Sequence, residues 1–313
     1  MNIYKKVSLA LFALILVGVG APLVSAQGMG LDYQFSSGIA SLETDSISIK
    51  VTGNNQVPHF HWWDPNNPTV DYHVMFVKMY EANDTDDNGV YDHNTDMIVG
   101  APFALPTTGW DFSGFEVEEV DGNATAVHFN FTTTETFDPR PSGMDFGQIP
   151  TLSPFDVYIQ IRVHLDLTNP SEMKFDLIVD GWQWTYDTSF MVLHFVVNES
   201  NHGQEMGTRD VAGFHKTGTK FQFSNGYFEY NETALAAQNQ VQVTASYGAG
   251  DEAQAGQSIY LAFENFGNET LVYDPVLGIE SATSMTLDSM TLTIVGGLAA
   301  VVLIGAIVVK VRK

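Results

Sequence analysis

Short apolar runs with a period of two recur along most of this 313-residue chain, and they constrain its fold more than any other feature. In one such run, Ile47, Ile49 and Val51 alternate with polar residues. This alternation places the apolar side chains on one face of a β-strand, and the Gly, Pro, Asn and Asp residues between the runs favour turns. No long amphipathic helix is predicted between the ends of the chain. The pattern predicts an all-β fold, an antiparallel β-sandwich of about 11 to 13 strands.

The predicted strands lie at residues 46–51, 71–80, 110–117, 126–133, 157–167, 173–179, 189–197, 220–223, 227–230, 240–246 and 258–263. One short helical turn is predicted at residues 233–239. We expect the sandwich to occupy residues 27–274, with an alternative division into two domains at the Pro-rich stretch 137–154. Residues 275–289 are predicted to form a stalk.

The N-terminal end has the pattern of a secretory signal peptide. Lys5 and Lys6 precede an uncharged apolar run, and Val24-Ser25-Ala26 supplies the small residues of a cleavage site. We therefore expect residues 1–26 to be a signal peptide and the body of the protein to lie outside the cell.

The other end has the pattern of a membrane anchor. Residues 290–309 carry no charge, and as a helix they would extend about 30 Å, the thickness of the hydrocarbon core of a bilayer. The tail at residues 310–313 is basic, and basic residues favour the cytoplasmic side. These features predict a single transmembrane helix in the cell membrane, with the C-terminus in the cytoplasm and an extracellular ectodomain.

The acidic residues are confined to the predicted ectodomain. The chain has 37 Asp and Glu against 13 Lys and Arg, and residues 27–289 contain all 37 acidic but only 8 basic residues, a net charge of −29. This surface excludes nucleic acid as a partner, because binding its phosphates requires basic side chains. The absence of Cys excludes a disulfide scaffold, a Cys-ligated metal site and a thiol nucleophile.

Oxygen-bearing side chains are concentrated between residues 84 and 96, as in a calcium-binding loop. Calcium takes about six to eight oxygen ligands, and in such a loop a Gly makes the sharp turn, here Gly89. The residues that fit the ligand positions are Asp84, Asp86, Asn88, Asp92 and, through its carbonyl oxygen, Val90. The stretch resembles the calcium loop of the EF-hand and dockerin families. It departs from them at the last position, where Thr95 stands and Asp96, one residue later, is the alternative ligand.

Two histidines separated by one residue indicate a different kind of metal site. His59 and His61 point to the same face if they lie on a strand, and two imidazoles so placed can share a copper or zinc ion with a third ligand. His73, His128, His164 and His194 also lie in predicted strands, and the sequence does not distinguish among them as the third ligand. The alternative is that these histidines are hydrogen-bonded members of a strand surface.

Six Asn-x-Ser/Thr sequons indicate a glycoprotein. The acceptor residues are Asn83, Asn123, Asn130, Asn198, Asn231 and Asn268. Asn83 adjoins the acidic loop and Asn130 lies in a predicted strand, so either site is expected to be less accessible.

The overall layout is similar to that of uncharacterised archaeal membrane-anchored surface proteins, a resemblance that implies no activity. The leading hypothesis is a non-enzymatic, calcium-stabilised cell-surface protein that binds an extracellular protein or glycan, or belongs to the cell envelope. The alternatives are an extracellular copper- or zinc-binding or solute-binding module and an anchored glycan-acting hydrolase. No motif for a serine hydrolase, a zinc protease or a phosphate-binding loop is present.

Overall fold

The structure is a computed structural model that describes residues 30–53, 56–140, 153–203, 210–249 and 256–280. The prediction of an all-β, antiparallel fold is confirmed: in these residues the only helical element is a single 3₁₀ turn, η1 (Leu105–Thr107). The strands are β1 (Asp32–Ser36), β2 (Ile39–Glu43), β3 (Ser48–Thr52), β4 (His59–Trp63), β5 (Val70–Asn83), β6 (Met97–Ala104), β7 (Asp111–Phe112), β8 (Glu116–Val120), β9 (Asn123–Phe137), β10 (Phe155–Asp166), β11 (Glu172–Asp180), β12 (Ser189–Asn201), β13 (His215–Thr217), β14 (Lys220–Phe223), β15 (Gly226–Glu229), β16 (Thr233–Ala236), β17 (Asn239–Ala249), β18 (Gln257–Glu264), β19 (Leu271–Tyr273) and β20 (Val276–Ile279).

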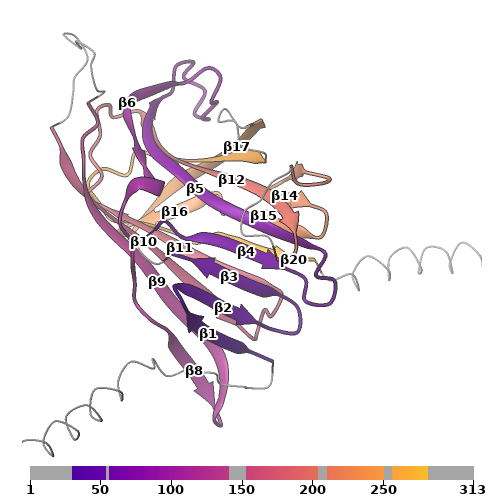
Figure 1. The fold of residues 1–313 in the computed structure, drawn as a ribbon. Helices are drawn as coiled ribbons and strands as arrows, with labels where there is room; N and C mark the ends of the chain where they lie inside the picture. Colours follow the sequence, from indigo (N-terminus) through magenta and orange to yellow (C-terminus); the bar gives the residue numbers. More distant parts are fainter. Residues whose placement is uncertain (1–29, 54–55, 141–152, 204–209, 250–255, 281–313) are drawn as a thin grey trace, which may run out of the picture.

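The first of two sheets begins with a meander of neighbouring strands. Its order is β1–β2–β3–β4–β5–β12–β18–β17, and β6 pairs with β5 beyond the end of β4 (Figure 1). β5 and β12 pair along 13 positions with one bulge, so they form the rigid centre of this sheet.

The second sheet is built around the long strands β9, β10 and β11. β7 and β8 pair with β9 at one edge, and β19 and β20 extend β11 at the other. β20 also pairs with β15, β15 pairs with β14, and β14 pairs with β13. β17 joins the two sheets, because its first residues pair with β16 and its later residues with β18.

The core lies between the two sheets. Phe60 on β4 stacks on Phe175 on β11, with ring centroids 5.6 Å apart, and both side chains are buried. The indole Nε1 of Trp62 donates a hydrogen bond to the carbonyl of Gly278 on β20 at 3.2 Å. Because Phe60 and Trp62 face the second sheet, the alternating residues His59, His61 and Trp63 face away from it.

Two predictions about local structure were wrong or incomplete. Residues 233–239 were expected to make a helical turn, but β16 and the start of β17 occupy this segment, and pairing with β17 and β19 outweighs the helical preference of Ala and Leu. Residues 275–289 were expected to be a stalk, but β20 lies in that segment and pairs with β11 and β15.

Several sequence predictions lie outside the described residues. They are the signal peptide at 1–26, the transmembrane helix at 290–309, the tail at 310–313 and most of the alternative domain boundary at 137–154. β9 and β10, which flank that boundary, pair with each other over 12 positions. Among the residues that the structure describes, no helix has the length and apolar character needed to cross a bilayer.

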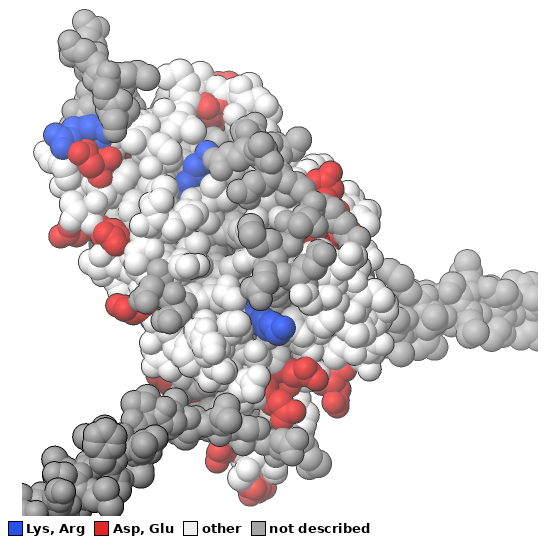
Figure 2. All heavy atoms as spheres, in the orientation of Figure 1, with Lys and Arg blue, Asp and Glu red and all other residues white. Residues whose placement is uncertain are grey.

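The surface is acidic but unevenly so. In the view of Figure 2 the carboxylates lie mainly around the margin, and much of the centre carries neither acidic nor basic groups. The outer face of the first sheet also carries a small second apolar cluster, to which Tyr80, Tyr91, Phe190 and Tyr260 belong.

Candidate metal centre

The hairpin of β4 and β5 brings three histidines together on the outer face of the first sheet. His59 and His61 alternate with core residues on β4, and the antiparallel register places His73 on β5 directly opposite His61. One ligand nitrogen from each ring lies within 4.8 Å of the others. The ring centroid of His61 is 4.4 Å from that of His59 and 4.2 Å from that of His73. The three imidazoles therefore form one cluster, which we call the three-histidine centre.

Hydrogen bonds fix the orientation of His73. His73 Nε2 lies 2.7 Å from Ser200 Oγ, which also lies 3.2 Å from the carbonyl of Asn201. We assign the hydroxyl hydrogen to that carbonyl and the ring hydrogen of His73 to Nε2. The lone pair of His73 is then on Nδ1, which faces Nε2 of His59 at 3.3 Å. A hydrogen-bond partner that fixes the tautomer of an imidazole is typical of a metal-binding histidine.

Burial keeps the three imidazoles neutral. His73 is fully buried, His61 is 5% exposed and His59 is partly exposed. Burial lowers the pKa of His59 from 6.5 to about 4 and, with a smaller contribution from His59, that of His73 to about 3. The pKa of His61 falls to about 2 because of burial first, and then the neighbouring His59, His73 and Lys50. Neutral imidazoles are the form that binds metal ions.

The spacing of one ligand pair, His59 and His73, suits a tetrahedral metal ion. Zinc–nitrogen bonds of about 2.0–2.1 Å place two nitrogen ligands roughly 3.3–3.4 Å apart, and the gap between His59 Nε2 and His73 Nδ1 is 3.3 Å. Three imidazoles without thiolate suit zinc or copper, and three protein ligands leave a fourth position for water or another molecule.

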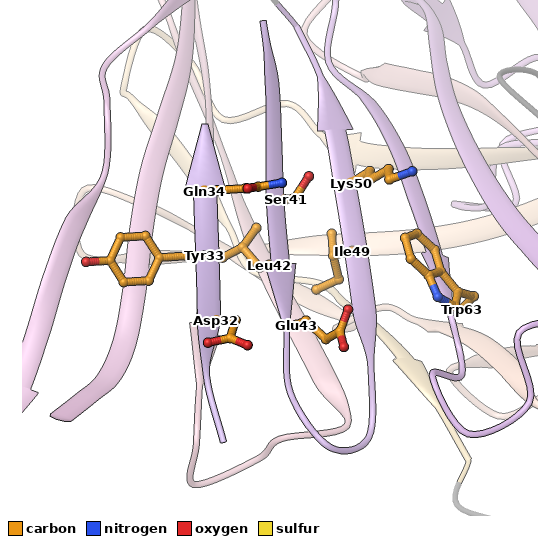
Figure 3. Close-up of a pocket in the computed structure, with 9 residues that line it drawn as sticks. All are labelled: Asp32, Tyr33, Gln34, Ser41, Leu42, Glu43, Ile49, Lys50 and Trp63. Atoms are coloured by element: carbon orange, nitrogen blue, oxygen red, sulfur yellow. The ribbon is translucent and has the colours of Figure 1, made fainter. Parts of the chain in front are cut away.

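A cavity of about 290 Å³ lies on β1 to β3 beside this centre (Figure 3). Lys50, which is paired with His61 across β3 and β4, extends to its edge, with its Nζ 5.4 Å from the ring centre of Trp63. Asp32 and Glu43 face each other across β1 and β2 and line the same cavity. The residues that line it are Asp32, Tyr33, Gln34, Ser41, Leu42, Glu43, Ile49, Lys50 and Trp63.

The acidic loop forms a second candidate centre of a different character. Oxygen atoms of Asp84, Asp86 and Asp96 lie within 4.8 Å of one another, so Asp96 joins the group as the sequence alternative suggested. Asp92 is not in this group, and its carboxylate accepts hydrogen bonds from the backbone and side-chain amides of Asn94. Tyr91 anchors the loop, because it is buried and its hydroxyl lies 2.8 Å from that of Tyr80.

The loop carboxylates already accept hydrogen bonds from the loop itself. Asp84 accepts from the amides of Asn88 and Gly89 at 3.2 and 2.7 Å. The side-chain amide of Asn88 donates to Asp86 at 2.8 Å, and the oxygen of that amide accepts from the backbone N–H of Val90. Partial burial would raise the pKa of Asp84, but these amides outweigh it and lower the pKa below 3.8.

The other histidines that the sequence offered as third ligands lie elsewhere. His128 and His164 are on β9 and β10 of the second sheet and pair with each other. His194 is on β12, where its Nε2 lies 2.9 Å from Ser258 Oγ and its ring stacks on Tyr260. Burial first, and then Lys78 and His93, lowers the pKa of His194 to about 3.

The sequons differ in accessibility. Asn231 and Asn268 are exposed, and Asn83, Asn123 and Asn130 are partly exposed. Asn198 is only 1% exposed, which leaves no room for a glycan in the folded protein.

Comparison with known proteins provides no family for this chain. No family model matches it, and no curated protein does. A solved structure with partial similarity is heparan sulfate lyase HepC from Pedobacter heparinus, with 8% sequence identity and a TM-score of 0.34. The similarity covers 89% of this chain and 42% of the lyase chain, so this chain spans less than half of the lyase's length. Similarity at this level carries no inference about function.

Sequence reasoning did not single out two residues of the centre. The sequence offers His73 as one of four equal candidates for the third ligand, and it carries no local signal for Ser200. A signal for His73 was present: the Pro- and Asn-rich turn at residues 65–69 joins two strands, and counting outward from it pairs residue 61 with residue 73.

Proposed function

We propose that this protein binds a transition-metal ion, zinc or copper, through His59, His61 and His73. The observation that carries the proposal is the position of His73, whose Nε2 lies 2.7 Å from Ser200 Oγ while its Nδ1 faces Nε2 of His59 at 3.3 Å. Burial of neutral imidazoles lowers the reorganisation needed for binding, because no proton has to leave and little solvent has to move.

The function supported best is that of a binding module with an accessible metal ion. His59 is the partly exposed member, so an ion bound here is reached from its side of the cluster. A fourth position would hold water or a polar group of an extracellular partner. This proposal favours the metal-binding alternative over the anchored hydrolase, because binding requires only the three nitrogen ligands that the geometry supports.

The test is the metal content of the full-length protein, purified without chelator and reloaded with Zn²⁺ or Cu²⁺. We expect the double variant His59→Gln/His61→Gln to lose one equivalent of tightly bound metal. His215→Gln is the matched control, because His215 is exposed and its Nδ1 lies 2.8 Å from the carbonyl of Gly213, away from the three-histidine centre. The proposal is wrong if the double variant retains as much metal as the wild type.

We also propose that calcium stabilises the acidic loop, as a second and separate function. The grouping of Asp84, Asp86 and Asp96 around a sharp turn supports it.

The wider role follows from the sequence: the apolar ends at 1–26 and 290–309 support a membrane-anchored protein whose ectodomain meets an extracellular protein or glycan. Protease treatment of intact cells tests that placement, since it should remove the ectodomain and leave the anchor.

A further inference from the structure

The second sheet carries a histidine pair on the face opposite to the core. His128 on β9 and His164 on β10 are directly paired in register, and their Nδ1 atoms are 2.7 Å apart. Their side chains are 16% and 20% exposed. The neighbouring core residues Val127 and Phe129 point inward, so the pair belongs to the outer surface and lies on a different sheet from the three-histidine centre.

A carboxylate holds the far side of each ring. His128 Nε2 lies 3.2 Å from Glu118 Oε1, and His164 Nε2 lies 2.8 Å from Asp176 Oδ2. An ionised carboxylate only accepts hydrogen bonds, so both Nε2 atoms carry hydrogen. If both rings are neutral, two lone pairs on Nδ1 face each other at 2.7 Å. That arrangement requires a cation between or beside the two nitrogens, either a proton or a metal ion.

The surroundings favour a cation. The pair lines a cavity of about 300 Å³ together with Asp166, Glu172, Asp176 and Asp274, and with Lys174 as the basic residue among those that line it. Asp274 Oδ1 is buried and has no hydrogen-bond partner in the part of the chain that the structure describes. Its other oxygen is 3.8 Å from Lys174 Nζ. Burial first, and then the nearby Asp176, raises the pKa of Asp274, while Lys174 and His164 oppose the shift.

We propose that His128 and His164 form a second, independent site for a divalent transition-metal ion. Asp274 lines the same cavity and becomes the third ligand by moving toward the pair, because these three residues are not among the groups whose ligand atoms lie within 4.8 Å of one another. Glu118 and Asp176 orient the two rings, as carboxylates do for metal-bound imidazoles. Two nitrogen ligands of one ion lie roughly 3.3 Å apart, so binding separates the rings by about 0.6 Å and is weaker than at the preformed three-histidine centre.

The test is a Zn²⁺ titration of the full-length, metal-free protein by calorimetry. The wild type should bind two equivalents, the second at least about tenfold more weakly than the first. The variant His128→Gln/His164→Gln should lose only the weaker event, and His59→Gln/His61→Gln only the stronger one. If the variant His128→Gln/His164→Gln binds zinc in the same two events as the wild type, the proposal is overturned.

The two metal proposals fail separately. If the three-histidine centre binds nothing, the wild type should still bind one equivalent that is lost in His128→Gln/His164→Gln. Where that double variant does not fold, the single variant His164→Gln provides the same comparison, with circular dichroism as the check on folding.

The role of Asp274 is tested with a matched carboxylate. Asp274→Asn should weaken the second event about tenfold, whereas Asp166→Asn should change it less than threefold, because Asp166 lines the same cavity but its carboxylate accepts from the N–H of Thr168. Equal losses in the two variants would contradict ligation by Asp274.

Discussion

The three-histidine centre and the acidic loop are both groups of potential metal ligands, but they are prepared in opposite ways. The imidazoles lie on paired strands, are largely buried and neutral, and one lies within hydrogen-bond distance of a buried serine. The carboxylates lie in a turn, Asp86 is exposed, and the loop's own amides occupy oxygens of Asp84 and Asp86.

The fold holds the histidine ligands in place before an ion binds, but it does not do so for the loop carboxylates. At the histidines, β4 and β5 hold the ligand atoms whether or not an ion is present, so little ordering remains to be done on binding. In the loop, an ion must compete with water and with the existing hydrogen bonds. We therefore expect a tight transition-metal site and a weaker calcium site.

The largest effect is expected at His73. His73→Gln removes the imidazole that the hairpin register brings to His59 and His61, and it should lower zinc affinity by more than about 100-fold. His194→Gln is the control, because His194 is also a buried strand histidine but lies outside the centre. Competition with a chromophoric chelator measures both affinities. Equal affinities in the two variants would exclude His73 as a ligand.

The next effect is expected at the serine that orients His73. Ser200→Ala leaves the three ligands in place but removes the partner of His73 Nε2, and it should weaken zinc binding by about 10- to 100-fold. Ser258→Ala removes the equivalent hydroxyl from His194 and should leave zinc affinity unchanged. A Ser200→Ala protein that binds zinc as tightly as the wild type would show that the orientation of His73 does not depend on this hydroxyl.

Acidification should affect stability through the buried histidines at a higher pH than through the loop carboxylates. The pKa of His194 is lowered from 6.5 to about 3, so between these values the unfolded chain binds a proton that the native protein does not, and stability falls as the pH falls. The slope from this residue is about 1.4 kcal/mol per pH unit well below pH 6.5. The loop residues Asp84 and Asp92 have pKa values below 3.8, so their carboxylates stay ionised over the pH range in which His194 lowers stability.

Urea unfolding of the metal-free protein at pH 7, 6 and 5 measures this dependence. His194→Gln should be less stable than the wild type at pH 7 but should lose less stability on acidification. Parallel pH profiles for the two proteins would mean that His194 is protonated in the native state.

Calcium should have a smaller effect on stability. At ten times its Kd, calcium should stabilise the protein by about 1.4 kcal/mol and raise the Tm by roughly 3–5 °C. Asp84→Ala plus Asp86→Ala should abolish the rise, whereas Asp87→Asn, a change outside the grouped carboxylates, should preserve it. No shift at millimolar calcium in the wild type removes the calcium proposal.

The smallest effect is expected at Lys50. Its positive charge, paired across strands with His61, opposes a bound cation, so Lys50→Gln should strengthen zinc binding by about two- to threefold. The gain should shrink in high salt, because exposed charges are screened. Unchanged affinity at low salt would show that Lys50 swings away from the centre when the ion binds.

Much of the fold could be predicted from the sequence, because apolar and polar residues alternate wherever one face of a strand is buried and the other is exposed. The run at 220–223 is predicted with its observed bounds, and the hairpin of β10 and β11 is predicted within two residues at each end. β16 was missed because four residues of Ala, Leu and Thr become a strand only through their neighbours β17 and β19.

For the candidate sites, the sequence predicts only those groupings whose residues lie close together in the chain. His59 and His61 share a face by periodicity alone, and the acidic loop is contiguous in sequence. Ser200 lies 127 residues from His73, and its place beside that ring depends on the pairing of β5 with β12, which no local pattern specifies. Asp96 belongs to the oxygen group and Asp92 does not, although the carboxylates of both accept hydrogen bonds from amides of the loop.

X-ray absorption at the zinc edge tests the central claim most directly. The sample is the full-length His128→Gln/His164→Gln protein loaded with one equivalent of Zn²⁺, so that only the three-histidine centre can be filled. We predict three imidazole nitrogens and one further light ligand at about 2.0–2.1 Å. A spectrum with fewer than three imidazoles, or with oxygen ligands alone, would contradict the assignment of His59, His61 and His73 as the metal centre.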